Sequence, residues 1–417
     1  MHINTVTTNA AAEKRRYTVA LIGSGPVGVH VLGRALSERL VSPEHVVVID
    51  PHAEVFSQWH RRVDNCRMQF LRSPASHGIA PDYRTIRRTI RTSRDFTPPY
   101  HRPSINLFAE HLQRYREASL SGVLRVQGWV RKIQPAPTGT GYTLRVSAES
   151  GERTISADVV ILAVGQPSPR MPRVLEALPS TAAVYHIHRD ASALDHLALG
   201  SEIALVGGGI AAGHLAVALG SGGHHVTIWN RDRFTNHQFD SNPCFIGPRC
   251  AGIIGSIQDY HHRRSLIQRS RRSGSVPQDL FWELRRLEYS RRIRVIRGEV
   301  THAAVAGSVG GAGDRVVLRG EVQSGIQSRE YDAVVACTGF SGGPPAADLV
   351  QQIARVLPAP RAEDGYPIPS GDLQWAPGLF VTGALAELEI GPPARNLVGA
   401  HLAGRRIIPA LRALMGS

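Results

Sequence analysis

The sequence is poor in cysteine and contains no long, unbroken apolar run. Four cysteines in 417 residues are too few for a disulfide framework, so a reducing, cytoplasmic setting is expected. The most apolar stretch, residues 203–220, is interrupted at positions 207–209 and 214, which indicates a strand, a turn and a helix and excludes a membrane span. Residues 1–16 lack the apolar core of a signal peptide and are predicted to form a loose tail.

Acidic residues are in the minority. Lys and Arg number 48 against 34 Asp and Glu, which gives a formal net charge of +14. Either an acidic substrate or carrier protein, or ordinary solvated basic faces, would account for this excess. No basic run is interleaved with aromatic residues as in a nucleic-acid groove, so no nucleic-acid partner is expected. The histidines do not have the spacing of a zinc or di-iron site, and no metal is expected.

The chain repeats a strand–turn–helix–strand pattern over residues 17–49 and again over residues 202–229. A helix is predicted over residues 104–119, and a hairpin between residues 124–130 and 142–146. We therefore predict an α/β fold with two Rossmann-like dinucleotide-binding domains, one inserted into the other. The outer domain is expected to span residues 17–175 and 331–417, and the inserted domain residues 176–330.

The first glycine-rich turn, Gly23-Ser-Gly25-Pro26-Val27-Gly28, follows a predicted strand and opens a predicted helix. The absence of a Cβ permits a tight turn at the first glycine, close approach of a pyrophosphate at the second and close strand–helix packing at the third. Asp50 ends the next strand, where a carboxylate can accept hydrogen bonds from ribose hydroxyls. This complete context predicts a dinucleotide site.

The second glycine-rich turn contains Gly207, Gly209 and Ala212, again between a strand and a helix. No acidic residue stands at the ribose position that follows. Arg231 and Arg233 could instead hold a 2′-phosphate, which favours NADPH over NADH, although two solvated arginines are the ordinary interpretation.

The two turns lie about 180 residues apart, and segments 160–165 and 334–339 each run from a strand into a glycine. This arrangement resembles the flavoproteins that bind two dinucleotides, which implies FAD at the first turn and NADPH at the second. Within them, the chain resembles the class B flavoprotein monooxygenases, and most of all the siderophore-type lysine and ornithine N-hydroxylases. The matching residues, in the order of that family, are Trp59-His60, Met68-Gln69, Phe70-Leu71-Arg72, the helix segment Arg102–Tyr115 and Asp240–Phe245.

The resemblance implies an FAD- and NADPH-dependent monooxygenase that uses O₂ and a flavin C4a-hydroperoxide to oxygenate a small amine or amino-acid-like nucleophile. It implies cofactor contacts from Trp59, His60 and Met68, and from Asn396 and Leu397 at the start of the last helix. Gln69 is the candidate catalytic residue near the flavin edge, unless it is an ordinary polar loop residue. A homo-oligomer is also expected.

Two departures put the substrate of that family in doubt. Its asparagine–glutamate pair is replaced by Gly247-Pro248, and its asparagine–tyrosine motif has no counterpart near residues 275–279. An ornithine or lysine substrate is therefore not implied. The main alternative is an NAD(P)H-dependent reductase of a disulfide or a small acceptor, for which Cys244 and Cys250 would form the redox pair unless they are incidental thiols. A non-catalytic flavin- or nucleotide-binding protein is the third possibility.

Overall fold

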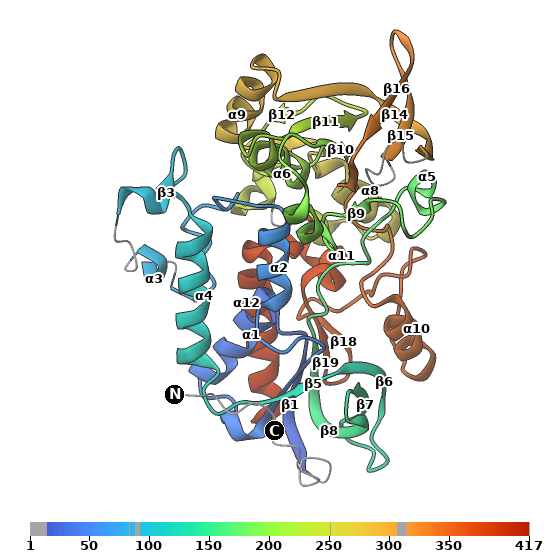
Figure 1. The fold of residues 1–417 in the computed structure, drawn as a ribbon. Coiled ribbons are helices and arrows are strands. Elements are labelled where there is room, and N and C mark those ends of the chain that lie inside the picture. The colour runs from blue at the N-terminus through green and yellow to red at the C-terminus, as the bar shows by residue number, and fades with distance from the viewer. Residues whose placement is uncertain (1–14, 83, 88–91, 251, 307–314, 417) are drawn as a thin grey trace.

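The structure is a computed structural model that describes residues 15–82, 84–87, 92–250, 252–306 and 315–416. All but the last two residues of the expected N-terminal tail lie outside these ranges. The described chain forms two lobes, each built on one large sheet, and the two sheets lie one above the other in Figure 1. No described helix is long and apolar enough to cross a bilayer.

The first lobe contains a sheet with the strand order β18-β19-β8-β1-β2-β5. Two further strands branch from it, since β7 pairs with β8 and β6 pairs with β7. Strands β1, β2, β5, β8 and β19 run parallel, so their carboxyl ends share one edge. The bounds are β1 (Arg16–Ile22), β2 (Val46–Asp50), β5 (Leu124–Gln127), β6 (Trp129–Pro135), β7 (Tyr142–Ala148), β8 (Gly151–Leu162), β18 (Gln374–Ala376) and β19 (Leu379–Val381).

The helices of the first lobe cover its sheet and supply the largest apolar core. Helix α1 (Pro26–Ser37) packs against α12 (Leu397–Met415) and α4 (Ile105–Ser119), while α10 (Ala347–Val356) packs against β6. The predicted helix over residues 104–119 is confirmed, and its expected cap is present, since Ser104 Oγ accepts a hydrogen bond from Leu107 N at 3.2 Å. The shorter helices of this lobe are α2 (Ser57–Asn65), α3 (Arg84–Arg87) and α11 (Glu387–Ile390), whereas α5 (Arg173–Glu176) packs on the second lobe.

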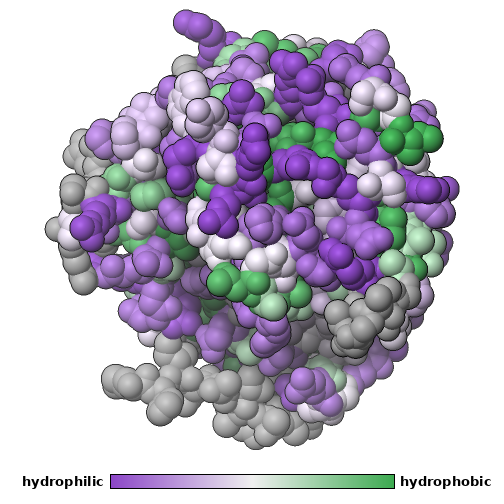
Figure 2. All heavy atoms as spheres, turned by 45° about the horizontal axis from the view of Figure 1, so that its top comes forward, coloured by the Kyte–Doolittle hydropathy of each residue, from purple (hydrophilic) through white to green (hydrophobic). Residues whose placement is uncertain are grey.

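The second lobe has the strand order β16-β15-β14-β11-β10-β17-β9, with α6 (Ile210–Ser221) and α9 (Gln278–Tyr289) packed on each other beside it. The bounds are β9 (Val184–His186), β10 (Glu202–Val206), β11 (His225–Asn230), β14 (Ile293–Ala306), β15 (Arg315–Val322), β16 (Gly325–Tyr331) and β17 (Ala333–Ala336). The face that includes the top of this lobe is largely hydrophilic, with apolar residues in small scattered groups (Figure 2).

A long excursion leaves the second lobe between β12 (Thr235–Asn236) and β13 (Ser275–Val276), two short strands that pair with each other. We call residues 237–274 the strap. It carries α7 (Ile253–Ser256) and α8 (Tyr260–Ser270), and both helices contact α11 of the first lobe. The strap therefore joins the two lobes at a point far in sequence from their covalent connections.

The predicted α/β fold with two Rossmann-like units is confirmed, but the strands of the predicted hairpin were wrong. Strand β5 pairs in parallel with β2, and the hairpin is formed by β6 and β7, because the chain breaks at Gly128, whose N–H donates to Asp50 O. Strand β17 belongs to the second sheet, where it pairs with β10 and β9. The chain therefore returns to the first lobe only after residue 336, later than the expected boundary at 331.

Candidate dinucleotide-binding sites

The first glycine-rich turn lies at the carboxyl edge of the first sheet, directly after β1. Gly23 has a φ of +97°, and a Cβ there would collide with the carbonyl oxygen of Ala163 at the end of β8. A Cβ on Gly28 would lie 2.7 Å from the Ala163 Cβ. These two glycines are therefore required by the packing of the strand, the turn and α1.

Packing within the protein does not explain the glycine at position 25. A Cβ at this position would meet no atom within 4 Å, so the space beside it is open. Gly25 is also the N-cap of α1 and offers no side-chain acceptor, and Pro26 occupies the first helical position. The amides of Val27 and Gly28 are thus left at a helix N-terminus, whose dipole favours an anion such as a pyrophosphate.

Asp50 places a carboxylate beside the first glycine-rich turn. It ends β2, is 9% exposed, and each of its carboxylate oxygens accepts one backbone hydrogen bond. Ser24 N donates to Oδ2 at 2.6 Å and His52 N donates to Oδ1 at 2.8 Å. These bonds fix the carboxylate beside the glycine turn and leave further lone pairs on both oxygens.

The second turn repeats this geometry at the carboxyl edge of the second sheet. Gly207 has a φ of +124°, and a Cβ there would meet the carbonyl oxygen of Cys337 at the end of β17. Gly209 faces open space and is the uncapped N-cap of α6, in which Ala212 is fully buried. The first glycine of each turn also makes an equivalent backbone hydrogen bond to the next strand. Gly23 N donates to Ile49 O and Gly207 N donates to Trp229 O, both at 2.8 Å.

This correspondence makes Asn230 the counterpart of Asp50. Each is the residue after the carbonyl that the first glycine contacts, and each ends its strand. The Asn230 side chain is buried against Gly208, and its Nδ2 has no hydrogen-bond partner among the described residues. From the sequence, this position shows only that an acidic residue is missing. Arg231 and Arg233, which follow, are exposed and form no ion pair with a described residue.

The residues of the N-hydroxylase-like segment lie where the two lobes meet. Trp59 in α2 packs against Phe108, with ring centroids 5.4 Å apart, and borders the same apolar cluster as Leu397. His60 contacts the Trp59 ring edge-on. Met68 packs against the core of the second lobe. The Gln69 side chain is exposed and its carbonyl accepts a hydrogen bond from Ile105 N, so the described contacts leave this side chain available to a ligand.

The last helix, α12, begins near these residues. Asn396 is its N-cap, and Asn396 Oδ1 accepts a hydrogen bond from Gly399 N at 3.2 Å. The amide of Gly399 in the first turn is therefore already satisfied, and the amides of Leu397 and Val398 remain for a ligand. They lie at a helix N-terminus that follows the carboxyl end of β19 by a short segment.

Sequence reasoning missed a set of buried charges that hold the lobes together. Arg72 donates to Gln238 O at 2.8 Å, to His237 O at 2.9 Å and to Ser275 Oγ at 2.8 Å, and burial lowers its pKa to about 10. Arg102, 1% exposed, pairs with Asp279 of α9 at 2.5 Å. The sequence singled out Arg72 as the basic residue of the Phe-Leu-basic triplet and Arg102 as the start of a family-like helix segment, but it indicated neither residue's partner in the second lobe.

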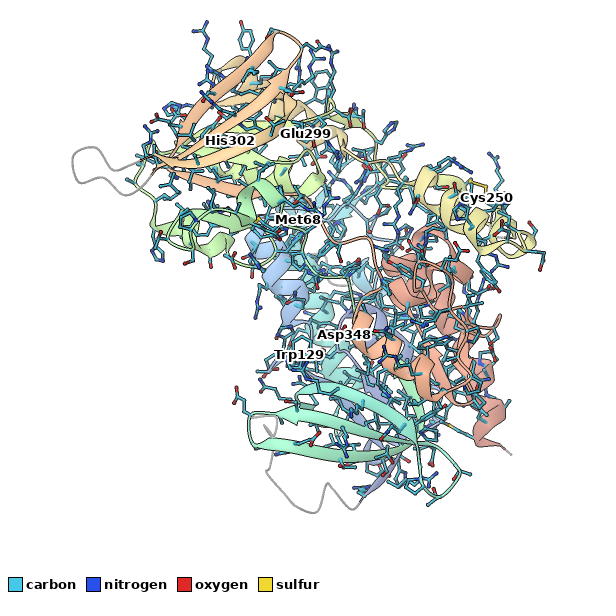
Figure 3. All side chains as sticks on the ribbon, turned by 90° about the vertical axis from the view of Figure 1, so that its right-hand side faces the viewer. Met68, Trp129, Cys250, Glu299, His302 and Asp348 are labelled. Carbon is cyan, nitrogen blue, oxygen red and sulfur yellow. A yellow bond between two sulfur atoms is a disulfide. The ribbon has the colours of Figure 1, made fainter. Side chains whose placement is uncertain are left out.

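The cysteines correct a second expectation. Cys244 and Cys250 form a disulfide in the strap, with Cα atoms 5.2 Å apart, so they are not incidental thiols. Figure 3 shows Cys250 at the outer edge of the strap, well apart from Met68 at the junction of the lobes. Cys66 and Cys337 are free and buried, and burial raises the pKa of Cys66 to about 12, which disfavours its thiolate.

Comparison with known proteins places the chain in a family. The family described as pyridine nucleotide-disulphide oxidoreductase matches residues 17–242, and the chain belongs to it. No curated protein matches. Among solved structures, the ornithine N-hydroxylase of Kutzneria sp. 744, described with reduced FAD, NADP⁺ and L-ornithine, has a TM-score of 0.77 at 16% identity and covers 96% of this chain and 100% of its own.

Two further solved structures, one of a hydroxylase and one of a reductase, are also similar to the chain. The ornithine hydroxylase of Pseudomonas aeruginosa has a TM-score of 0.74 at 17% identity, with 96% of this chain and 99% of that chain covered. The bacillithiol disulfide reductase of Bacillus cereus has a TM-score of 0.60 at 16% identity, with 96% and 100% covered. The resemblance to N-hydroxylases inferred from the sequence is thus confirmed at the level of the fold.

Proposed function

We propose that this chain is an FAD- and NADPH-dependent monooxygenase that N-hydroxylates, or otherwise oxygenates, a small amine or amino-acid-like nucleophile. The observation that carries this proposal is the presence of two complete, open glycine turns, each at the carboxyl edge of its own sheet. The fold supports it, since the chain superposes better on the Kutzneria ornithine N-hydroxylase, with a TM-score of 0.77, than on the Bacillus cereus disulfide reductase, with 0.60.

The residues of the first turn fit FAD. A pyrophosphate fits beside Gly25 at the N-terminus of α1, and Asp50 is oriented for ribose hydroxyls. The flavin end would extend toward Gln69 and the amides of Leu397 and Val398. Bound FAD would accept hydride from NADPH and, once reduced, react with O₂. The protein binds and orients the cofactor, and its apolar residues around Trp59 limit water.

The residues of the second turn fit NADPH. The helix α6 N-terminus takes the pyrophosphate, and Arg231 and Arg233 are unengaged cations beside the expected position of the 2′-phosphate. The net charge of +14 supports an acidic substrate or an acidic carrier protein as partner. A homo-oligomer and a cytoplasmic location stay predictions from the sequence.

A disulfide reductase is the second candidate, because the chain does contain a disulfide. Electron transfer by thiol–disulfide exchange needs a cysteine pair against the flavin. Cys250 lies at the outer edge of the strap, apart from Met68, which favours the oxygenase (Figure 3).

The test is a panel of primary amines, amino acids and thioethers incubated with purified holoenzyme, NADPH and O₂. We expect NADPH oxidation and a product heavier by one oxygen atom, detected by mass spectrometry, with peroxide measured in parallel for uncoupled turnover. NADPH consumption that instead requires a disulfide acceptor and yields thiols in stoichiometric amounts would establish the reductase.

A further inference from the structure

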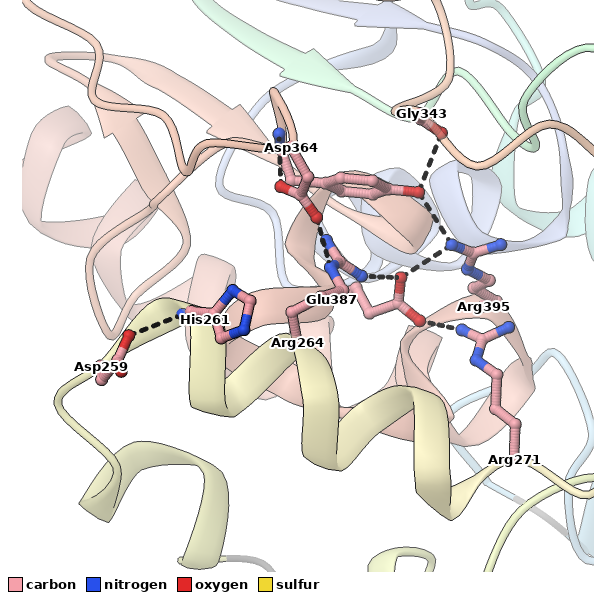
Figure 4. Close-up of polar contacts among 9 residues, drawn as sticks. Asp259, His261, Arg264, Arg271, Gly343, Asp364, Glu387 and Arg395 are labelled. Atoms are coloured by element: carbon pink, nitrogen blue, oxygen red, sulfur yellow. Dashed lines mark hydrogen bonds and ion pairs between the residues drawn. The ribbon is translucent and has the colours of Figure 1, made fainter.

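A buried ionic cluster joins the strap to the segment that leads into α12 (Figure 4). Its centre is Glu387 of α11, which is wholly buried. Arg264 of α8 donates to Glu387 Oε2 at 3.0 Å, and Arg395, the residue before Asn396, donates to the same oxygen at 2.7 Å. Arg271, at the end of α8, pairs with Oε1. One carboxylate thus receives three guanidinium groups.

The cluster has an excess of positive charge. Besides Glu387, the carboxylate that it engages is Asp364, which pairs with Arg264 Nε at 2.5 Å. Three guanidinium groups therefore face two carboxylates. Arg271 remains a cation at neutral pH, because burial lowers its pKa only to about 10. Asp240 also acts on Arg271, but this carboxylate is exposed and water screens it.

The position of the excess charge connects it to the first dinucleotide site. Arg395 Nη1 donates to Gln166 Oε1 at 3.3 Å, and Gln166 follows the carboxyl end of β8. Glu387 and Arg395 lie between the carboxyl end of β19 and the N-terminus of α12. The cluster therefore borders the edge of the sheet on which Gly23 and Gly25 lie, beside a helix N-terminus that is itself positive.

Tyr366 keeps the geometry of the cluster fixed. Its ring lies under the Arg264 guanidinium at 3.9 Å, and its hydroxyl accepts from Arg395 Nη2 at 2.9 Å while donating to Gly343 O at 3.0 Å. The guanidinium groups of Arg264 and Arg395 are thus held by contacts on several sides and do not rely on Glu387 alone.

We propose that this cluster is an electrostatic part of the flavin site, in which the partly buried arginines stabilise the negative charge of reduced flavin and Glu387 limits that stabilisation. Glu387 is in this sense a positioning residue that acts through Arg264, Arg271 and Arg395. The inference rests on the proposed binding of FAD in the first lobe. It predicts that the flavin potential responds to the sign of the charge that is removed.

Two substitutions that change the charge of the cluster in opposite directions test this proposal. Glu387→Gln removes a negative charge and should raise the flavin potential, whereas Arg271→Gln removes a positive charge and should lower it. At a fixed potential, the ratio of reduced to oxidised flavin should change by roughly tenfold in each case, the order expected for one unit charge acting across a partly buried region. Arg269→Gln is the matched control, because Arg269 is on the same helix but exposed, and it should leave the ratio unchanged.

The measurement is a dye-equilibrated titration of the FAD-loaded proteins, which needs no substrate and no turnover. Shifts in the same direction, or no shift in either variant, would show that the cluster only ties the strap to the first lobe. Arg271 is part-exposed, so its variant decides the question even where Glu387→Gln does not fold. A protein that binds no FAD at all would refute the proposed function, which is a separate outcome.

Discussion

Replacing Asn230 by aspartate should convert the second dinucleotide site from NADPH to NADH preference. The two glycine turns make equivalent backbone hydrogen bonds, and Asn230 in the second turn corresponds to Asp50 in the first. Asp50 shows what a carboxylate does at this position, since backbone N–H groups orient it beside the turn. In the Asn230→Asp variant a negative charge would therefore face the 2′-position of the bound nucleotide.

The magnitude follows from two opposing effects. A carboxylate about 6 Å from one phosphate charge, at an effective dielectric constant near 20, is repelled by roughly 3 kcal/mol, which exposure to salt reduces to about 1–2 kcal/mol. The same carboxylate would accept a hydrogen bond from the ribose of NADH, with a net gain of about 1 kcal/mol. Together these effects should move the ratio of the two kcat/KM values by roughly 30- to 150-fold toward NADH.

The assay is steady-state oxidation of NADPH and NADH, with binding of NADP⁺ and NAD⁺ measured by calorimetry. Asn230→Ala is the control, because it removes the amide without adding charge and should change the ratio little. Replacing Arg231 or Arg233 by glutamine should weaken the interaction with NADPH by about 1.5–3 kcal/mol, which lowers kcat/KM for NADPH by about tenfold to a hundredfold. The kcat/KM for NADH should change little. A wild-type preference for NADH, or equal ratios for the aspartate and alanine variants, would refute the reasoning.

Three other outcomes are expected. Gly25→Val should fold normally, because the new side chain meets only open space, yet should yield colourless protein; stoichiometric FAD in that variant would contradict the assignment. Replacing both Cys244 and Cys250 by serine should lower the free energy of unfolding by about 2 kcal/mol through the loss of a short closed loop, while NADPH oxidation stays within a few-fold of wild type. Burial lowers the pKa of His30 to about 3 and of His111 to about 4. Because the unfolded chain takes up protons first, stability should be complete above pH 6.5 and fall as the pH drops toward 4, by about 1.4 kcal/mol per pH unit for each histidine; urea unfolding at pH 7 and pH 5 measures this.

The sequence predicted the nucleotide turns because their signals are local. A tight turn needs a glycine with positive φ, and both Gly23 and Gly207 have it, each against the carbonyl of a strand that arrives much later in the chain. The helix starts at residues 26 and 210 follow from the same turns. Such features depend on a few neighbouring residues, so a motif is sufficient to find them.

The contacts between the lobes could not be predicted in this way. Glu387, Arg264 and Arg271 are ordinary charged residues in sequence, and only the docking of the strap on α11 brings them together. The same holds for the disulfide, since the spacing of Cys244 and Cys250 matches no redox motif and becomes meaningful only when the loop folds back. Whether Gln69 contacts a flavin stays a prediction.

The place of β17 in the second sheet has a consequence for cutting the protein into pieces. The strand lies between β10 and β9 and is supplied by chain that follows the β14–β16 hairpins. A fragment that stops at residue 330 would leave the edge of β10 unpaired and β9 without its neighbour, with a row of bare backbone N–H and C=O groups open to self-association. A separately expressed second lobe should therefore extend beyond Ala336. The structure thus makes residues 337–342, not 331, the natural point at which to divide the gene.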